Sequence, residues 1–178
     1  MAKRNYPLGK VYALLEPGPV VLLATAGRDR PDVMAMSWQM PVEFEPPLVA
    51  CVLGPYDYSY GQLRKNRECT LNIPTVELAE KVVAVGNCSG RDVDKFATYG
   101  LTAKPGSLVD APLVKECYAS LECRVHDTRM VNRYGIFILE VVKAWVDTAV
   151  KEPATLHHRG WGKFAVAGET IRIASRMK

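Results

Sequence analysis

The residues best suited to chemistry form a polar stretch just past the middle of the chain, Ser89-Gly90-Arg91-Asp92-Val93-Asp94-Lys95-Phe96. The stretch combines two cations, two carboxylates, a hydroxyl and a glycine, and it ends on an aromatic residue between two apolar regions. Hydroxyl, backbone N–H and basic groups are the donors that an anionic group such as a phosphate requires. The stretch therefore indicates a rigid place to hold an anionic, partly apolar ligand.

The two basic residues of this stretch have two interpretations. Arg91 and Lys95 lie four residues apart, so they share one face if residues 92–99 are helical. On that face they could clamp an anion. Alternatively, they pair with Asp92 and Asp94 as a solvated charge cluster, which an arbitrary chain favours by about three to one. The residues alone leave both interpretations open.

A second group of candidate residues lies earlier, where a run of small and apolar residues ends in Met36-Ser37-Trp38. The indole of Trp38 could form a wall against a planar ring, and the hydroxyl of Ser37 could donate a hydrogen bond to that ring or to a phosphate. The alternative is that Trp38 packs in the core, which is about twice as common for a tryptophan without other context.

Length and composition are those of an ordinary globular protein. The 178 residues, 48% hydrophobic and 24% charged, favour a single domain over 1–178 with a sizeable core. The net charge of +4 is mild and the basic residues are scattered, which disfavours a nucleic-acid interface. No apolar run approaches the roughly 20 residues of a membrane span, so we expect no membrane association.

Cysteine and histidine usage narrows the chemistry further. The five cysteines are an odd number and include no Cys-x-x-Cys pair, which predicts free thiols in a reducing compartment and hence a cytoplasmic protein. His157 and His158 are adjacent and diverge in any regular structure, and the other histidine is His126. Solvated loop histidines are therefore a better interpretation than a metal site.

Short strands separated by turns are predicted for the first half of the chain. Residues 20–25 and 33–38 are β-rich and flank a turn composition at 27–32, which indicates a hairpin. Three prolines between residues 41 and 47 then predict an irregular crossing, because proline removes a ladder donor. The other elements expected in this half are a strand at 48–53, a helix at 59–66, a strand at 69–73, a helix at 75–85 and a short helix at 92–99.

The second half is predicted to be rich in strands. Residues 119–126 alternate with period two, so one face of that strand should be buried and the other solvated. Residues 135–142 form the longest apolar run, expected at the centre of the sheet after a polar loop at 129–134 and extended by 145–150. A late strand at 170–173 completes a pattern typical of a barrel or sandwich with helices added.

Several motifs occur in a fixed order between about residues 10 and 148. They are Val20-Val21-Leu22-Leu23-Ala24-Thr25, Met36-Ser37-Trp38, Pro46-Pro47-Leu48-Val49-Ala50, Ser89 to Phe96, Ala111-Pro112-Leu113 and Leu121-Glu122-Cys123-Arg124-Val125. The ordered set resembles the flavin reductase-like family, and within it the flavoredoxins most. This resemblance implies a mainly β fold with added helices, a split β-barrel that binds FMN near the interface of a homodimer.

The resemblance also implies roles for the matching residues. Trp38 would contact the flavin ring, and Lys95 would reach its polar edge. Ser89 and Arg91 would shape the loop around the cofactor, and Arg64 is a weaker candidate for the phosphate. The backbone of residues 51–53 would contact the flavin, and residues 58–59 would lie near the phosphate. The predicted cofactor-binding set is Met36, Ser37, Trp38, Gln39, Cys51, Val52, Leu53, Tyr58, Ser59, Ser89, Arg91, Lys95 and Phe96.

The function implied by the resemblance is that of an FMN-binding redox protein of flavoredoxin type, which passes electrons or hydride through its FMN to a partner. No side chain is then needed as a catalytic acid or base, since the chemistry belongs to the cofactor. One alternative is an NAD(P)H:flavin oxidoreductase that releases reduced FMN. A further alternative is a non-catalytic flavin-binding protein.

The C-terminal tail, from about residue 155 to residue 178, departs from the simpler flavin reductases. It carries apolar Trp161, Phe164 and Ile171, which must cover something. We expect the tail to pack on its own barrel, with the partner subunit or the flavin as alternatives. A covered flavin would be held tightly, which favours an electron carrier.

Overall fold

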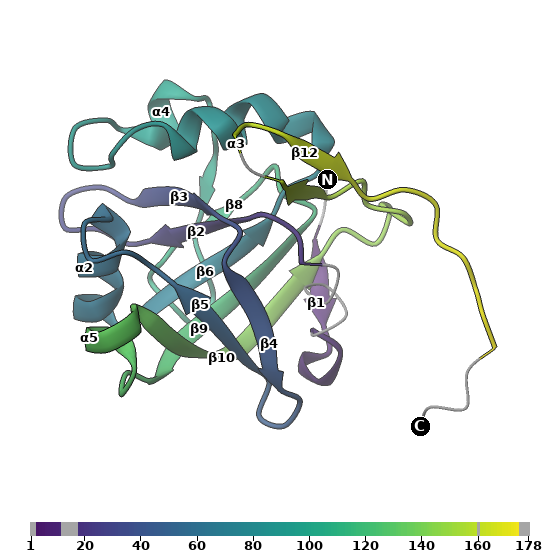
Figure 1. Cartoon of the computed structure of the whole chain (residues 1–178), viewed down its shortest axis with the longest axis horizontal. Coiled ribbons are helices and arrows are strands. Elements are labelled where there is room, and N and C mark those ends of the chain that lie inside the picture. The colour runs from purple at the N-terminus through teal and green to yellow at the C-terminus, as the bar shows by residue number, and fades with distance from the viewer. Residues whose placement is uncertain (1–2, 12–17, 160, 175–178) are drawn as a thin grey trace.

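The computed structural model describes residues 3–11, 18–159 and 161–174 (Figure 1). Its strands are β1 (Arg4–Tyr6), β2 (Val21–Thr25), β3 (Asp32–Met36), β4 (Gln39–Glu43), β5 (Leu48–Val52), β6 (Glu68–Ile73), β7 (Ala103–Lys104), β8 (Leu113–Val114), β9 (Ala119–Asp127), β10 (Ile136–Val146), β11 (Leu156–His158) and β12 (Phe164–Val166). Its helices are η1 (Leu8–Lys10), α2 (Tyr58–Asn66), η2 (Val76–Leu78), α3 (Ala79–Gly86), α4 (Lys95–Thr98) and α5 (Val131–Tyr134).

An eight-stranded antiparallel sheet dominates the fold, in the order β3-β2-β6-β9-β10-β5-β4, with β1 paired to β10. The sheet curls into a half-barrel, with α2 and α5 at one end and α3 and α4 across the β2–β3 side (Figure 1). The expected mainly β barrel with a few helices is therefore confirmed, and β10 is an interior strand as predicted. Among the described residues, no helix is long and apolar enough to cross a membrane.

The predicted hairpin forms from β2 and β3, with Thr25 opposite Asp32 next to the turn. Gly27 in this turn has a φ of +71°, and a Cβ there would lie 1.8 Å from the carbonyl oxygen of Arg30. A left-handed conformation and so close a contact both require glycine. Gly27 therefore fixes the position of the turn between β2 and β3.

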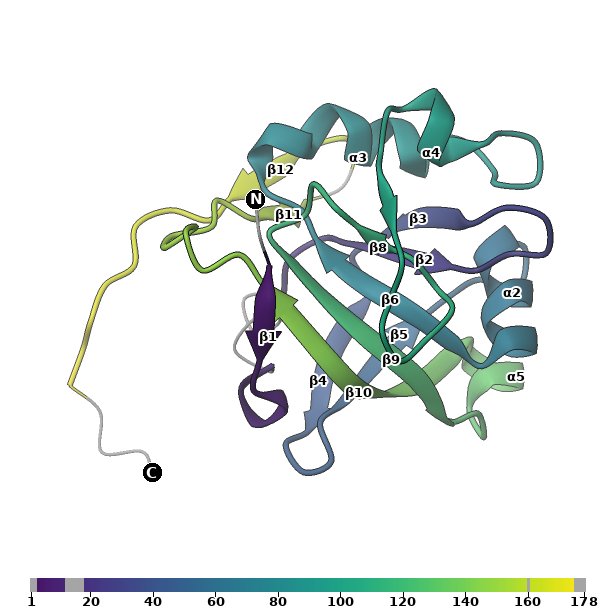
Figure 2. The same cartoon turned by 180° about the vertical axis from the view of Figure 1, so that it is seen from behind.

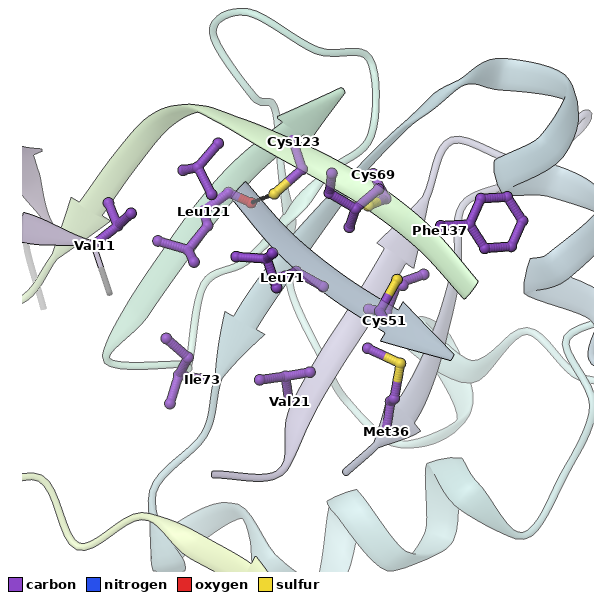
Figure 3. Packing of buried hydrophobic residues seen from close by; sticks show 14 of the residues in the cluster. Val11, Val21, Met36, Cys51, Cys69, Leu71, Ile73, Leu121, Cys123 and Phe137 are labelled. Atoms are coloured by element: carbon purple, nitrogen blue, oxygen red, sulfur yellow. Dashed lines mark hydrogen bonds between the residues drawn. The ribbon is translucent and has the colours of Figure 1, made fainter. Parts of the chain in front are cut away.

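Two apolar clusters lie on opposite sides of β2, which explains its unbroken apolar sequence. Val21 and Leu23 point into the larger cluster, inside the curled sheet, where they join residues of β5, β6, β9 and β10 (Figure 3). Leu22 and Ala24 point the other way, into a second cluster with residues of α3, α4 and β11. Because successive strand residues face opposite sides, burying both faces demands apolar residues throughout.

Several local predictions for the first half need correction. Residues 39–43 form the edge strand β4 rather than an irregular crossing, since an edge position and a bulge after Pro41 tolerate proline. The helix predicted at 92–99 is only the short α4, whose first turn is capped by the Asp94 carboxylate accepting from the N–H of Ala97 at 3.0 Å. Arg91 therefore precedes the helix and does not share a face with Lys95.

The C-terminal predictions are only partly right. Leu156 and Phe164, in the hairpin of β11 and β12 that also contains the two adjacent histidines, pack on the barrel. Trp161, between the two strands of this hairpin, is 99% exposed and Ile171 is 71% exposed, so neither of these side chains packs on the barrel. Residues 167–174 form no strand and run away from the body in both views (Figures 1 and 2). Residues 160 and 175–178 of the tail lie outside the described residues.

Other differences lie around the long strands β9 and β10. The predicted polar loop at 129–134 contains the one-turn helix α5. The predicted solvated face of β9 holds only for Arg124 and His126, whereas Ser120 and Glu122 are fully buried. The segment from residue 103 to 114, which precedes β9, covers this face. A period-two pattern shows which residues of a strand share a face, but it does not show whether another segment covers that face.

The Glu122 carboxylate is buried without a cationic partner among the described residues, and hydrogen bonds stabilise it. It accepts from the indole Nε1 of Trp145 at 2.7 Å, from the Ser107 hydroxyl at 3.1 Å, and from the backbone N–H groups of residues 107–109 at 2.6–3.2 Å. Burial by itself would raise the pKa of Glu122, but these donors outweigh it and hold the pKa below its ordinary value of 4.5. This carboxylate thereby ties the covering segment to the sheet.

We predict that Glu122→Gln lowers the free energy of unfolding by about 1.5–3 kcal/mol at neutral pH, because an amide cannot accept from all these donors. A group with a lowered folded-state pKa contributes its stability above the unfolded-state pKa and loses it as pH falls through the folded-state pKa. Urea denaturation at several pH values should therefore show the difference between wild type and variant shrinking below about pH 4.5.

The matched control is Glu140→Gln, because the Glu140 carboxylate is 40% exposed and lies 3.5 Å from His126. An exposed pair of this kind is worth at most about 1 kcal/mol. Equal effects of the two substitutions would contradict the role of Glu122.

Candidate functional site

Three adjoining cavities, with volumes of about 260, 340 and 630 Å³, follow the outer side of the edge strand β3. Ala35 lines all three, while Met34 and Met36 each line two of them. Because β3 ends the sheet, one side of its backbone faces these cavities instead of another strand. Together they form an elongated candidate site along one strand.

The largest of the three cavities has aromatic and apolar walls. It lies where β3, β5 and α5 end, and its walls include Trp38, Leu53, Tyr60 and Tyr134. The Trp38 side chain is 71% exposed and that of Tyr134 is 51% exposed, so both aromatic rings stand at the mouth. Aromatic walls with free faces are suited to stacking against a planar ring.

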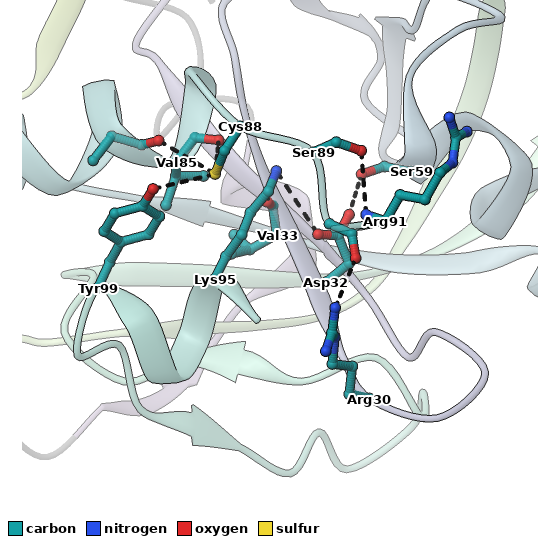
Figure 4. Close-up of polar contacts among 12 residues, drawn as sticks. Arg30, Asp32, Val33, Ser59, Val85, Cys88, Ser89, Arg91, Lys95 and Tyr99 are labelled. Carbon is teal, nitrogen blue, oxygen red and sulfur yellow. Dashed lines mark hydrogen bonds and ion pairs between the residues drawn. The ribbon is translucent and has the colours of Figure 1, made fainter. Parts of the chain in front are cut away.

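The 340 Å³ cavity is polar, and part of the Ser89–Phe96 stretch lines it. Ser59, Ser89, Gly90 and Lys95 line it. Behind this lining lies the carboxylate of Asp32, 3% exposed, whose Oδ2 accepts from the Ser59 hydroxyl at 2.6 Å (Figure 4). The Lys95 Nζ lies 3.8 Å from Asp32 Oδ1 and donates to the carbonyl of Val33 at 2.9 Å.

Gly90 permits the close approach of this loop to β3. A Cβ at residue 90 would lie 1.9 Å from Asp32 Oδ1 and 2.9 Å from Cδ1 of Tyr58. The carbonyl of Gly90 accepts from the guanidinium of Arg30 at 3.3 Å, which holds the loop from the other side. Glycine is needed here for space.

The N-terminus of α2 and one guanidinium, that of Arg91, lie beside the polar cavity. This helix begins without a side-chain cap, because the Asp57 carboxylate accepts from the N–H of Gly54 at 2.7 Å instead. The Arg91 guanidinium lies 5.9 Å from the ring centre of Tyr58, the first residue of α2. A helix N-terminus beside a cation is a favourable place for an anion.

The 260 Å³ cavity extends the site toward the C-terminal hairpin. Its walls include Val82 and Asn87 from the α3 side and His158 and Phe164 from the β11–β12 hairpin. The rings of His158 and Phe164 have their centres 5.2 Å apart. The tail hairpin therefore contributes to the walls of the site.

The structure brings most of the predicted cofactor-binding residues to these cavities. Those that line a cavity are Met36, Ser37, Trp38, Val52, Leu53, Tyr58, Ser59, Ser89 and Lys95. Arg91 stands beside them through its contact with Tyr58.

Three predicted residues lie elsewhere. Phe96 is 5% exposed and packs in the second apolar cluster. Cys51 is fully buried inside the barrel, where burial raises the pKa of its thiol well above the ordinary value, so it is a neutral core residue. The Gln39 side chain donates to the carbonyl of Pro19 at 2.9 Å.

For Trp38 and Lys95 the structure excludes one of the alternatives left open by the sequence. Trp38 is exposed and does not pack in the core. Lys95 is 4% exposed and pairs with Asp32, so it is not part of a solvated cluster with its sequence neighbours. Arg64 lies in the last turn of α2, at the opposite end of the helix from Tyr58.

Sequence reasoning missed several residues of the site. Asp32 was assigned to a turn, and Met34, Ala35, Asn87 and Tyr60 were not singled out. Asp32 alternates with Met34 and Met36 along β3, and this alternation could have grouped them. No sequence signal shows that the fold brings Lys95 to Asp32.

Comparisons with known proteins agree with this architecture. The family model for the flavin reductase like domain matches residues 14–165. An uncharacterized protein of Escherichia coli (strain K12), YddH, is 37% identical over 172 residues, which cover 89% of this chain and 91% of that protein.

Solved structures show the same fold. An FMN-binding domain of a flavin reductases-like enzyme from Shewanella baltica OS155 superposes with a TM-score of 0.91 at 28% identity, covering 97% of this chain and 98% of that one. The flavoredoxin of Desulfovibrio vulgaris (Miyazaki F) superposes with a TM-score of 0.81 at 27% identity, covering 88% and 90%. The split-barrel prediction is thus confirmed.

We predict that Gly90→Ala lowers the free energy of unfolding by about 1–3 kcal/mol, because the new methyl group must displace Asp32 or the loop. The matched control is Gly61→Ala within α2, where an added Cβ meets nothing within 4 Å. That change should raise stability by about 0.5–1 kcal/mol. Chemical denaturation of both variants measures the contrast, and a Gly90→Ala protein as stable as wild type would contradict the packing described.

Proposed function

The chain belongs to the flavin reductase-like family, and from this premise we propose that it is a single FMN-binding domain that acts as a flavoredoxin-type redox protein. The observation that carries the proposal is the continuous site along β3, with an aromatic cavity at one end and a polar, cationic cavity at the other. FMN has the same division between a planar ring and a phosphate.

The polar end fits the phosphate. The uncapped N-terminus of α2 and the guanidinium of Arg91 would hold its negative charge, assisted by the lining of Ser89. The hydroxyl of Ser59 is already bonded to Asp32, so the backbone N–H of Ser59 would face the anion instead.

The aromatic end fits the ring. Trp38 and Tyr60 would form walls of the ring pocket, and the backbone of β3 and of residues 52–53 would supply polar contacts at its edge. Lys95 lines the polar cavity, which adjoins the ring cavity at Met34 and Ala35, so its charge would act on the flavin from that side. When bound, FMN supplies the electron- or hydride-transfer chemistry, while these side chains bind it, orient it and set its electrostatic surroundings.

A second candidate function, an NAD(P)H:flavin oxidoreductase, is supported by the exposed mouth of the large cavity. Trp38 is 71% and Tyr134 51% exposed in the single chain, which leaves room for a second flat ring beside the flavin. Anaerobic absorbance spectra of the desalted protein distinguish the two functions. Flavin bands that persist after NADH addition support the carrier, and bands bleached by NADH support the oxidoreductase.

The same spectra test the shared premise. A protein that carries no flavin and takes up none from added FMN would contradict both functions. A protein that keeps FMN but exchanges electrons with neither nicotinamide cofactors nor redox proteins would be the non-catalytic flavin-binding alternative.

We predict that Arg91→Ala weakens FMN binding by about tenfold to a hundredfold, the value of a charge-assisted hydrogen bond to phosphate. Riboflavin has no phosphate, so its affinity should be unchanged. Arg64→Ala is the matched control, because Arg64 is an exposed arginine at the far end of α2. Fluorescence titration with both flavins measures the four affinities, and an equal loss for FMN and riboflavin would exclude a phosphate contact.

We also propose that the protein is a homodimer. Trp38, which directly precedes the edge strand β4, and Met40 and Val42 within it are 71%, 61% and 46% exposed, which gives an apolar stripe along this edge of the sheet. Residues 167–174 form an extended C-terminal arm, on which Ile171 and Ile173 are 71% and 76% exposed. Contiguous apolar surface of this kind is typical of an interface, and a second copy would cover both the stripe and the arm.

We predict that Met40→Glu shifts the protein toward monomer, because the interface would then have to bury an unpaired carboxylate. Val76→Glu is the control, since Val76 is 38% exposed and lies away from the stripe. Sedimentation velocity over a range of concentrations gives the dissociation constants. A wild-type chain that sediments as a monomer at every concentration would exclude the dimer.

A further inference from the structure

We propose that Asp32 is a positioning residue that sets the charge which bound flavin experiences from Lys95, and thereby sets the reduction potential of the flavin. This inference rests on the proposed FMN site. It concerns a residue behind the cavity lining, which holds two groups of the lining in place without facing the cofactor itself.

The first observation is the double attachment of the Asp32 carboxylate. Its Oδ2 accepts from the Ser59 hydroxyl at 2.6 Å, and its Oδ1 lies 3.8 Å from the Lys95 Nζ. Both Ser59 and Lys95 line the polar cavity. Asp32 is therefore linked to the start of α2 and to the start of α4 at once.

The second observation is that Oδ1 is buried and accepts no hydrogen bond from the described residues. Gly90 packs over this atom, since a Cβ there would lie 1.9 Å away. A buried carboxylate is costly unless charge or hydrogen bonds compensate it. Lys95 is thus the cation that compensates Oδ1, although it donates its hydrogen bond to the Val33 carbonyl.

The consequence is electrostatic. The side chains of Asp32 and Lys95 are 2% and 4% exposed, so solvent screens the pair weakly. With both charges present, a flavin beside Lys95 experiences a dipole rather than a full positive charge. Reduced flavin carries more negative charge than oxidised flavin, so removing the carboxylate should favour the reduced form.

The test is Asp32→Asn, which keeps an oxygen to accept from Ser59 while removing the charge. We expect the ratio of the FMN dissociation constants, oxidised over reduced, to rise about tenfold, which equals about 30 mV for a two-electron couple. A purely structural role would weaken both forms alike and leave the potential unchanged. Redox titration of the FMN-loaded protein measures the shift.

Asp92→Asn is the matched control, because it removes one exposed carboxylate from the loop that carries Gly90. Solvent and salt screen that position, so its potential should equal that of wild type. The double variant Asp32→Asn with Lys95→Gln removes both charges and should return the potential toward the wild-type value. If Asp32→Asn alone fails to fold, Asp32→Ser, which also removes the charge, is titrated in its place and should show a shift in the same direction.

The outcomes separate the inference from the proposed function. If wild-type protein binds no FMN, the proposed function fails. If FMN binds but Asp32→Asn and Asp92→Asn have the same potential, the role of Asp32 is excluded while the FMN site stands. If the double variant keeps the full shift of the single variant, Lys95 is not the group through which Asp32 acts.

Discussion

The need to compensate one buried carboxylate organises the candidate site. Asp32 begins β3, and its partners come from segments far away in the sequence, Ser59 in α2 and Lys95 in α4. An uncompensated charge at this depth would be strongly destabilising, so the three segments are held together wherever the chain is folded. Gly90 lets the intervening loop close over the carboxylate. The polar cavity is the space that this arrangement leaves.

The double-sided burial of β2 has an equally wide effect. Because apolar clusters lie on both of its faces, β2 fixes the position of β3 between the barrel interior and the helices α3 and α4. β3 is thereby presented as an edge strand with cavities along its outer side. Glu122 in β9 is a second buried carboxylate, and hydrogen-bond donors stabilise it in place of a cation.

Family membership and site geometry both support the proposed flavin site. A flavin carries out its own electron transfer, so in this proposal the protein would act through binding, orientation and charge. The proposed division of labour assigns phosphate binding to the start of α2 with Arg91, and ring contact to Trp38 and β3. Potential tuning falls to the pair of Asp32 and Lys95. In the proposed homodimer, a second copy would cover the exposed β4 stripe and the arm.

Local patterns in the sequence were sufficient for much of this fold. The β2–β3 hairpin, the helix α2, the long strand β10 and the mainly β class follow from periodicity, turn residues and apolar runs, which act over a few residues. The ordered motifs were sufficient for the family. Both kinds of signal are local, and nine of the thirteen cofactor-binding residues that the motifs implied line the cavities.

Tertiary structure decided which segments cover one another. Periodicity shows that a strand has two faces, yet it does not show that a loop covers Glu122, that Trp38 stays exposed or that Phe96 packs in the core. The alternation at 170–173 predicted a strand, but the described structure provides no neighbouring strand with which it pairs. The pairing of Lys95 with Asp32 joins residues 63 positions apart, and only the folded chain brings such charges together.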